Sequence, residues 1–391
     1  MNITRNDTQW RKGWAAACVA LGLAAGGSAQ AGPTLEYGEQ GLLQLNYALQ
    51  FWGQSRGYTS STDDGDTNDF FLRRNRITLM GQYNDYVGYY AQLEAGNDSK
   101  GGNDDRSVYY RDAYLTLDYS DPVRFIAGRF KNTFSRENLE ACLEPLTLDR
   151  AESLAYTPYG GTRDTGVAMW GNLADGMFQY RVMVSDGREA EETVTDSLRL
   201  TGRVHVSLLD PEYDYGYRGT YLGTQQVLTI GASFDQQDDI AYGSFSTRED
   251  PRDYSASTVD IFYEQPFDFG TVTLSGAAFD YSVDGFPTDP DPELNANVER
   301  EGTYAKAGYL LPNKVGMGRL QFFVRAEETE YGEELGLSDQ SWNSLGANYY
   351  LDGQSLKVTF EHASIEFDEE HATNPALQDY DQTTVGLQMI F

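Results

Sequence analysis

The sequence predicts an all-β protein, a 16-stranded antiparallel transmembrane β-barrel, and three observations lead to this fold class. From residue 41 onward, segments of about ten residues alternate apolar and polar side chains, as strands with one apolar face do. Sixteen such segments occur, and a closed antiparallel bacterial barrel needs an even number. Short and long connections alternate along the chain, which is typical of turns at one membrane face and loops at the other.

Composition excludes several other classes of protein. The chain has 391 residues, with 60 acidic and 29 basic side chains and a net charge of −31. Such a chain is not expected to bind nucleic acid, because phosphate contacts need clustered lysine and arginine. Aromatic residues make up 13% of the sequence, which argues against a disordered protein. Beyond the N-terminal segment no run of about 18 apolar residues occurs, so no transmembrane helix is expected.

Residues 1–31 have the features of a secretory signal peptide: a basic end, an apolar run at 14–25 and a small-x-small cleavage site. We expect cleavage after Ala31, which leaves residues 32–391 as a single outer-membrane barrel. The mature chain then keeps one cysteine, Cys142, so an intrachain disulfide and a multi-cysteine metal or haem site are impossible.

The predicted strands follow one another at regular intervals. The clearest is 198–208, where leucine, valine and glycine alternate with arginine, threonine, histidine and serine. The last strand ends on Phe391, which resembles the C-terminal signal of bacterial outer-membrane barrels. The sixteen strands are expected near residues 41–52, 70–83, 86–96, 107–119, 122–131, 165–173, 177–185, 197–209, 225–235, 255–265, 269–281, 303–311, 318–327, 341–351, 354–365 and 381–391.

The connections sort into two kinds. A soluble β-sandwich also alternates its side chains, but it has no reason to sort its loops by length. One connection, 210–224, breaks the alternation as a short-side turn with an insertion. The short connections are 84–85, 120–121, 174–176, 265–270, 312–318 and 352–353, and the long ones are 53–69, 97–106, 131–164, 186–196, 236–254, 282–302, 328–340 and 366–380.

Residues 70–173 contain five ordered motifs. The chain reads FFLRRNRI from Phe70, RDAYL from Arg111, AGRFKNTFS from Ala127, LDR from Leu148 and GGTRDTG from Gly160. Their order and spacing resemble the phosphate-selective porin O/P family, with its RRxR element in strand two. The family's Gly-x-Phe-Lys-x-x-Phe start and Arg-Asp-x-Gly end of the third loop are matched as well.

The resemblance implies a 16-stranded barrel, usually trimeric, whose third loop folds inward and narrows the pore. Residues 131–164 form the longest loop and are therefore the expected constriction. The implied function is an outer-membrane porin, a water-filled channel for passive diffusion of small hydrophilic solutes, including anions such as phosphate or other oxyanions. The expected partners are outer-membrane lipid, lipopolysaccharide, the solutes and two further copies in a homotrimer.

Basic residues in this region are the candidate pore-lining or anion-guiding groups. They are Arg74, Arg76, Lys131, Arg136, Arg150, Arg163, Arg199 and Arg203. The polar strand faces predict nine inward basic residues and seven inward acids, a balance that departs from the family's arginine ladder and lysine cluster. The basic ones are Arg74, Arg76, Arg181, Arg199, Arg203, Lys306, Arg319, Arg325 and Lys357, and the acids are Glu94, Asp112, Asp118, Asp260, Glu264, Glu327 and Glu361.

The arginines at 73–76 allow two interpretations. They pair across the lumen with Glu94 and Asp112 on neighbouring strands, or they form an anion-guiding patch that faces the constriction. Arginine binds carboxylate and phosphate groups bidentately, so both are physically sensible.

No catalytic, cofactor or metal motif is found in the sequence, and no enzyme activity is expected. The three histidines, His205, His362 and His371, are not spaced as metal ligands. Two alternatives stay open: a barrel hydrolase using His362 or His371 at the rim, and a barrel that sheaths a redox protein or acts as a scaffold for a surface partner. A sheath would need a haem partner encoded elsewhere, because the chain has no C-x-x-C-H motif.

The long loops are strongly acidic. The seven long loops other than the third carry 33 acidic and 7 basic residues. Two hypotheses explain this charge: hydration of the cell surface in a salty medium, or divalent cations that bridge the loops to anionic lipopolysaccharide.

Overall fold

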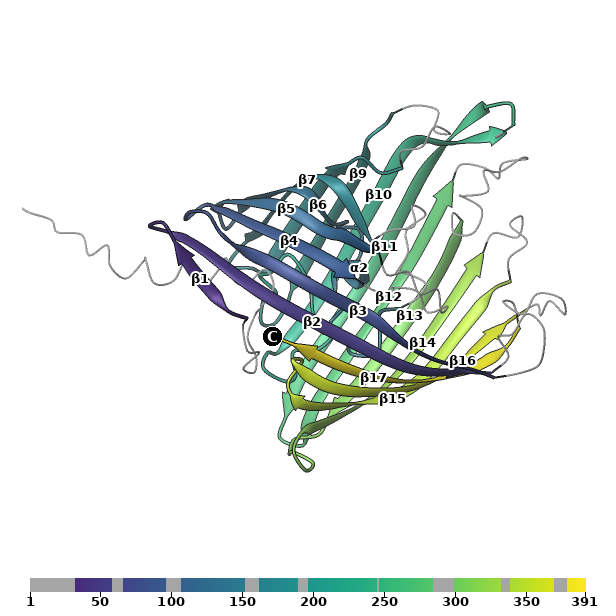
Figure 1. The fold of residues 1–391 in the computed structure, drawn as a ribbon. Coiled ribbons are helices and arrows are strands. Elements are labelled where there is room, and N and C mark those ends of the chain that lie inside the picture. Colours follow the sequence, from purple (N-terminus) through teal and green to yellow (C-terminus); the bar gives the residue numbers. More distant parts are fainter. Residues whose placement is uncertain are drawn as a thin grey trace, which may run out of the picture.

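The computed structural model describes residues 32–57, 66–95, 107–151, 162–188, 196–244, 246–283, 299–331, 338–368 and 378–391. In these ranges sixteen antiparallel strands, β2 to β17, each pair with the next along the chain, and β17 pairs with β2 to close a barrel (Figure 1). No helix in this part of the chain is long and apolar enough to cross a membrane.

The bounds of the elements agree with the predicted order of strands. The first half contains β1 Thr34–Tyr37, β2 Gly41–Arg56, β3 Thr67–Gln82, β4 Val87–Ala95, β5 Val108–Ser120, β6 Val123–Lys131, helix α2 Arg136–Leu139, β7 Arg163–Leu173, β8 Phe178–Ser185 and β9 Arg199–Ser207. The second half contains β10 Val227–Ser244, β11 Glu249–Phe267, β12 Gly270–Val283, β13 Arg300–Leu310, β14 Arg319–Tyr331, β15 Gln340–Asp352, β16 Leu356–Phe367 and β17 Tyr380–Ile390.

The seam of the barrel joins the two ends of the chain. Gln388 of β17 lies opposite Gln50 of β2, and the backbones of Phe391 and Tyr47 exchange two hydrogen bonds of 2.8 and 3.0 Å. The short strand β1, which the sequence pattern did not predict, pairs with the start of β2. The terminal residue therefore extends the ladder and leaves no free strand edge at the seam.

Strand faces follow the predicted alternation. In β9 the side chains of Arg199, Arg203 and His205 point inward and are buried, whereas Val204 points outward and is 57% exposed. Phe323, the apolar residue that breaks the pattern of β14, is also buried on the inner side. Polar groups therefore line the interior, and apolar side chains cover the outer surface that lipid contacts.

One predicted loop is wrong. Residues 236–254 were expected as a long loop, but β10 and β11 extend through most of this range and form a hairpin that projects beyond the other strands (Figure 1). The pairing continues past a register shift at Gln237 and reaches Ser244, which lies opposite Glu249. The aspartates and glutamines of this segment have the composition of a loop, but ladder hydrogen bonds do not depend on side-chain polarity.

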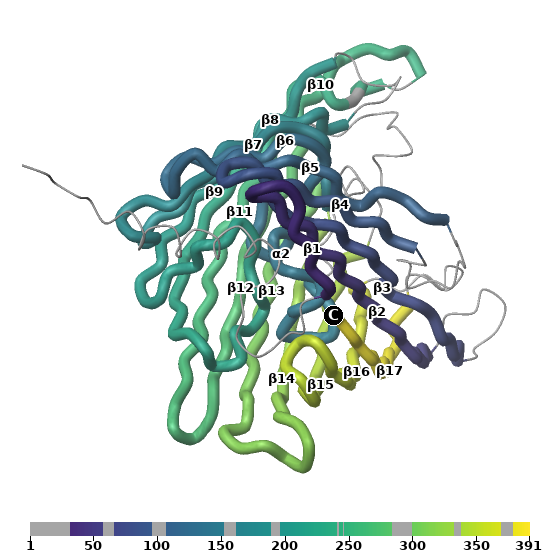
Figure 2. Tube along the Cα trace, turned by 60° about the vertical axis from the view of Figure 1, so that its left-hand side comes forward, coloured from purple at the N-terminus to yellow at the C-terminus, as the bar shows by residue number. Residues whose placement is uncertain are grey.

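The described part of the third long connection, up to Ala151, lies inside the barrel. Helix α2 begins after Ser135, whose hydroxyl accepts a hydrogen bond of 2.9 Å from the backbone of Asn138, and both tube and ribbon views place the helix within the ring of strands (Figure 2). The loop carbonyls of Leu143 and Leu146 accept hydrogen bonds from Gln388 and Asn348 on the inner surface.

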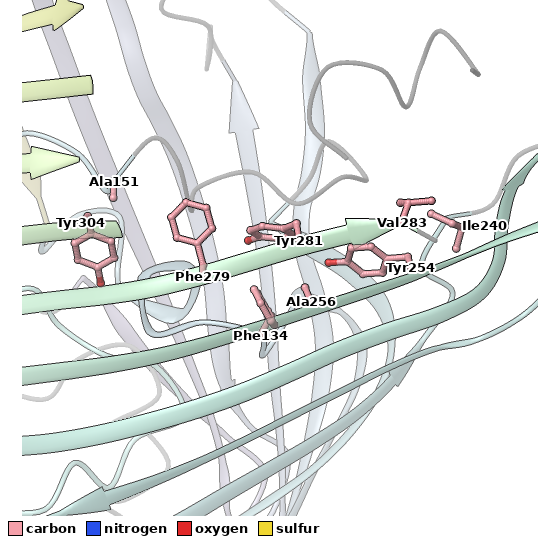
Figure 3. Close-up of a cluster of buried hydrophobic side chains, with 9 residues drawn as sticks. All are labelled: Phe134, Ala151, Ile240, Tyr254, Ala256, Phe279, Tyr281, Val283 and Tyr304. Carbon is pink, nitrogen blue, oxygen red and sulfur yellow. The ribbon is translucent and has the colours of Figure 1, made fainter. Parts of the chain in front are cut away.

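An apolar cluster fixes the start of this loop to the wall (Figure 3). The ring of Phe134 lies 5.4 Å from that of Tyr281 on β12. Around this pair the cluster adds Ala151, Ile240, Tyr254, Ala256, Phe279, Val283 and Tyr304. Aromatic side chains on the inner faces of β11 to β13 thus bury loop residues as a core does, which gives the loop a defined position.

Candidate functional site

The arginine run on β3 holds a carboxylate of the third loop. A register shift between Gln50 and Phe51 of β2 lies opposite this run, and both Arg73 and Arg74 are buried. The guanidinium of Arg73 lies 2.7 Å and that of Arg74 2.9 Å from the carboxylate of Asp149. The two arginines therefore bind the part of the third loop around Asp149 to β3.

The next arginine follows one of the two predicted interpretations. Arg76 pairs with Glu94 at 2.9 Å, as expected for a contact between neighbouring strands, and Glu94 also receives Arg111 at 2.5 Å. Asp112 was expected to pair with the arginine run, but its partner is Arg163 at 3.1 Å. The loop carboxylate of Asp149 takes that role for Arg73 and Arg74, a contact that sequence spacing does not reveal.

Three further candidates are also paired with carboxylates. Arg136 of α2 forms two hydrogen bonds of 2.8 Å with Glu212. Arg203 lies 2.6 Å from Asp260 of β11, and Arg199 pairs with Asp235 of β10. Six of the eight candidate cations thus have a carboxylate within ion-pair distance, with Asp149 shared by Arg73 and Arg74 and Glu94 shared by Arg76 and Arg111.

Lys131 and Arg150 differ from the other candidates. The ammonium of Lys131 donates to the backbone oxygens of Leu139 and Glu140 at 3.3 and 2.5 Å. A guanidinium nitrogen of Arg150 donates to the backbone oxygen of Asn138 at 3.2 Å. Within the described ranges neither side chain has a carboxylate within 4 Å, so no ion pair neutralises either group beside the third loop.

A cavity of about 230 Å³ lies beside these groups. Its lining includes Arg76, Lys131 and Arg163 together with Cys142 and Tyr215. Burial raises the pKa of the Cys142 thiol, but the positive charges of Arg150, Lys131 and the β3 arginines outweigh it and hold the pKa well below its ordinary value. This part of the lumen is therefore electropositive.

A second titratable group lies at the same junction. Glu140 is buried at 1% exposure, and its Oε1 atom has no hydrogen-bond partner in the described structure. Burial and the negative charge of Glu137 raise the pKa of Glu140 to about 7, against the opposing charges of Lys306, Arg136 and Arg150. The charge of the loop interior consequently changes near neutral pH.

The sequence alone does not identify three carboxylates that pair with the candidate arginines. Asp149 lies in the LDR motif and Asp235 ends a predicted strand, but neither position indicates which arginine it meets. Glu212 lies in the irregular 210–224 connection, the one signal that something beyond a turn was present. Among the described residues no group of three or more histidine, cysteine or acidic side chains could hold a metal ion.

A closed barrel of sixteen strands with a polar interior, an apolar exterior and a long loop packed in the lumen defines an outer-membrane porin. Residues 45–256 match the sequence model of the phosphate-selective porin O and P family, more than half of the chain, and the protein belongs to that family. Membership in a family of channels agrees with the prediction that the chain is not an enzyme. No curated protein sequence matches the chain.

Solved structures share the fold at low sequence identity. OmpF of Salmonella typhi, in complex with daunomycin, is 15% identical with a TM-score of 0.59 and covers 92% of this chain and 100% of its own. The anion-selective porin from Comamonas acidovorans is 11% identical with a TM-score of 0.57, covering 90% and 100%. DcaP of Acinetobacter baumannii is 14% identical with a TM-score of 0.56, covering 92% and 100%. These likenesses show the 16-stranded architecture alone.

Proposed function

We propose that the channel favours small anions, including phosphate and other oxyanions, and that residues 131–164 are its constriction. Lys131 and Arg150 are the groups that attract the anion. One observation carries the proposal: among the eight candidate cations these two have no described carboxylate partner, whereas the other six are paired. The net positive potential therefore centres on the third loop.

The side chains of Lys131 and Arg150 suit the transient binding of an anion. An ammonium group and a guanidinium donate charge-assisted hydrogen bonds to oxyanions. Both side chains already donate to backbone carbonyls, so an anion adds to their contacts and does not replace an ion pair. A conducting site must hold a solute weakly enough to release it, and this arrangement provides attraction without a fully enclosed cage.

Reversal potentials in planar bilayers under a potassium chloride gradient test the anion preference. We expect the wild-type channel to favour chloride, and Lys131→Gln and Arg150→Gln each to shift the reversal potential toward cation selectivity. The double variant Arg203→Gln/Asp260→Asn is the matched control, since it removes a neutral pair and should leave the potential unchanged. An unaltered potential in both single variants would rule out these two groups as the anion site.

Conductance tests the constriction and the alternative function together. Replacing residues 136–150 by a short glycine-serine linker should raise the single-channel conductance, because pore diameter limits ion flow. A conductance equal to wild type would place the loop outside the permeation path. An open pore conducts alone, whereas a barrel that sheaths a partner is plugged and does not conduct, so the conductance of the protein separates the two functions.

Export and assembly complete the proposal. We infer that cleavage follows Ala31 and that three copies assemble in the outer membrane in contact with lipid and lipopolysaccharide. A solved structure of the 12% identical OmpT of Vibrio cholerae is described as a trimer form, which supports trimerisation as the first state to test. N-terminal sequencing of the mature protein and native mass measurement in detergent check the two points, and a monomer would contradict the second.

A further inference from the structure

The connection between β9 and β10 enters the barrel and meets the third loop. Tyr217 forms a parallel bridge with Glu140, and the backbone of Ala141 donates to the carbonyl of Tyr217 at 2.8 Å. The backbone of Gly219 donates to the carbonyl of Glu144 at 3.0 Å. The third loop comes from the long-loop end and this segment from the short-turn end, so the two meet as adjacent backbones inside the lumen.

A buried ion pair locks the two segments. The carboxylate of Glu212 accepts hydrogen bonds from both terminal guanidinium nitrogens of Arg136, and the hydroxyl of Tyr221 donates to the same carboxylate at 2.5 Å. The guanidinium of Arg136 also lies 4.4 Å from the ring centre of Tyr217 and 3.9 Å from that of Phe262 on β11. The helix of the third loop is therefore bound on its short-turn side by residues of the 210–224 connection.

The hydroxyl of Tyr217 lies among basic side chains of the wall. Arg181 and Arg203 donate to it at 2.7 and 3.0 Å, and Nδ1 of His205 lies 2.6 Å away. The second guanidinium nitrogen of Arg181 donates to the carbonyl of Tyr215 at 2.7 Å. This phenol therefore attaches the middle of the segment to β8 and β9.

The far end of the segment reaches the opposite strands. The carboxylate of Glu264 on β11 accepts from the backbones of Tyr221 and Gly223 and from the hydroxyl of Thr220, at 2.8 to 3.1 Å. Leu222 packs with Leu310 of β13 and Tyr350 of β15. The segment therefore extends along the inner surface from β8 to β15.

We propose that residues 210–224 are a second constriction element, which narrows the channel at the short-turn end and positions the third loop through Glu212 and Tyr217. The inference rests on the proposed role of the third loop as a lining of the permeation path. Because the segment extends along the inner surface from β8 to β15 and is buried at its contacts, it sets the size limit of the pore jointly with the loop. Glu212 and Tyr217 are positioning residues for Arg136 and Glu140.

The structure shows how to remove the segment without opening the barrel. The backbones of Asp210 and Gln226 are joined by a hydrogen bond of 2.8 Å, and Leu208 donates to Leu228 at 2.7 Å, so the β9–β10 ladder continues to that point. Replacing residues 211–225 by Asn-Gly closes it with a favoured hairpin turn. We expect a conductance gain of roughly twofold or more, because pore diameter limits flow.

The labelling rate of Cys142, the single cysteine of the mature chain, is a second measure of whether the channel opens when residues 211–225 are replaced. Cys142 is 3% exposed and shares its cavity with Tyr215 and Gly216 of the segment. An anionic methanethiosulfonate added from the short-turn side should label Cys142 faster in the Asn-Gly variant than in wild type, with Cys142→Ser as the blank. Shortening the connection 312–317, which contacts Tyr349 at the exposed rim, is the matched control and should change neither readout.

Point variants keep the inference falsifiable if the deletion fails to fold. Tyr217→Phe removes only the hydroxyl held by Arg181 and Arg203, and Glu212→Gln weakens the lock on Arg136. Both should increase current fluctuations and the labelling rate of Cys142, without changing the heat-dependent gel mobility that reports a folded barrel. Wild-type behaviour of both variants would overturn the positioning role.

The two deletions separate this inference from the proposed function. A gain in conductance from removing loop residues 136–150, with none from the Asn-Gly variant, refutes the second constriction and leaves the third-loop proposal intact. A gain from the Asn-Gly variant alone would leave residues 210–224 as the constriction and refute both the loop's role and the joint size limit. If neither deletion raises the conductance, both the third-loop proposal and the second constriction are refuted.

Discussion

Arg136 of the third loop and Glu212 of the β9–β10 connection form a two-pronged ion pair, with Nη1–Oε2 and Nη2–Oε1 distances of 2.8 Å. Their side chains are 0% and 1% exposed, so both charges are withdrawn from water. Burial would raise the pKa of Glu212, but Arg136 outweighs it and holds the pKa at about 2. A pair of this kind stabilises the fold only while both partners remain.

Removing one partner should therefore cost more than removing both. We expect Glu212→Gln to lower the free energy of unfolding by about 3 kcal/mol, because Arg136 keeps its charge without a carboxylate. The double variant Arg136→Met/Glu212→Met should lose less, since no unpaired charge stays buried. Urea unfolding of the barrel in lipid vesicles measures both, and equal or additive losses would contradict a coupled pair.

A second prediction concerns pH near neutrality. Glu140 has a pKa raised from 4.5 to about 7, so its carboxyl loses its negative charge as the pH falls through 7. We expect anion selectivity to increase between pH 8 and 6, measured as reversal potential in a chloride gradient. Glu140→Gln should reduce this change and move the selectivity at pH 8 toward its low-pH value. A pH response of unchanged size in Glu140→Gln would assign it to another group.

The same raised pKa has a consequence for stability. A carboxyl whose pKa is higher in the folded than in the unfolded chain contributes stability that is fully present below pH 4.5 and is lost as the pH rises through 7. Relative to wild type, Glu140→Gln should therefore gain stability at pH 8 more than at pH 5. Urea midpoints at the two pH values check the sign.

A third prediction uses the paired arginines of the wall. Arg203→Ala leaves Asp260 with an uncompensated charge in the lumen, since the two groups lie 2.6 Å apart. We expect the reversal potential to shift toward cations, and Arg203→Ala/Asp260→Ala to restore it because the pair is neutral as a whole. If the single variant leaves selectivity unchanged, the charges of the β9 wall do not act on passing ions.

The strand pattern could be predicted because each strand alternates its own faces. In β9 the inward position of Arg199 and Arg203 follows directly from period two. The extension of β10 and β11 could not be predicted, because Asp238 and Asp239 give the segment a loop composition while its backbone stays paired. Local composition and long-range pairing disagree at this hairpin.

The contacts of the candidate site lie beyond local patterns. Arg74 and Asp149 are 75 residues apart, and Arg136 and Glu212 are 76 apart. The sequence indicated an irregular connection at 210–224 but not that it turns inward. That direction depends on surfaces of β8, β11 and β15 that come together only in the closed barrel.

The last prediction concerns the acidity of the long-loop end. The seven long connections other than the third carry 33 acidic against 7 basic residues, whereas residues 32–391 carry 59 against 26, so most of the excess negative charge belongs to these connections. These counts come from the sequence and include the ends of the strands that border most of these connections, as well as the projecting end of the β10–β11 hairpin. The inner wall, by contrast, pairs most of its charges. The outer vestibule is therefore expected to repel multivalent anions on their way to the constriction.

Ionic strength should switch this repulsion on and off. The Debye length is about 30 Å at 0.01 M salt and about 3 Å at 1 M, so loop charges act across the vestibule only at low salt. We expect sulfate permeation from the long-loop side to be slower at low than at high salt, relative to permeation from the opposite side. Replacing the five acidic residues of 366–380 by amides should reduce the difference. Faster sulfate permeation at low salt would mean that the cations at Lys131 and Arg150 act beyond the loops and dominate the approach.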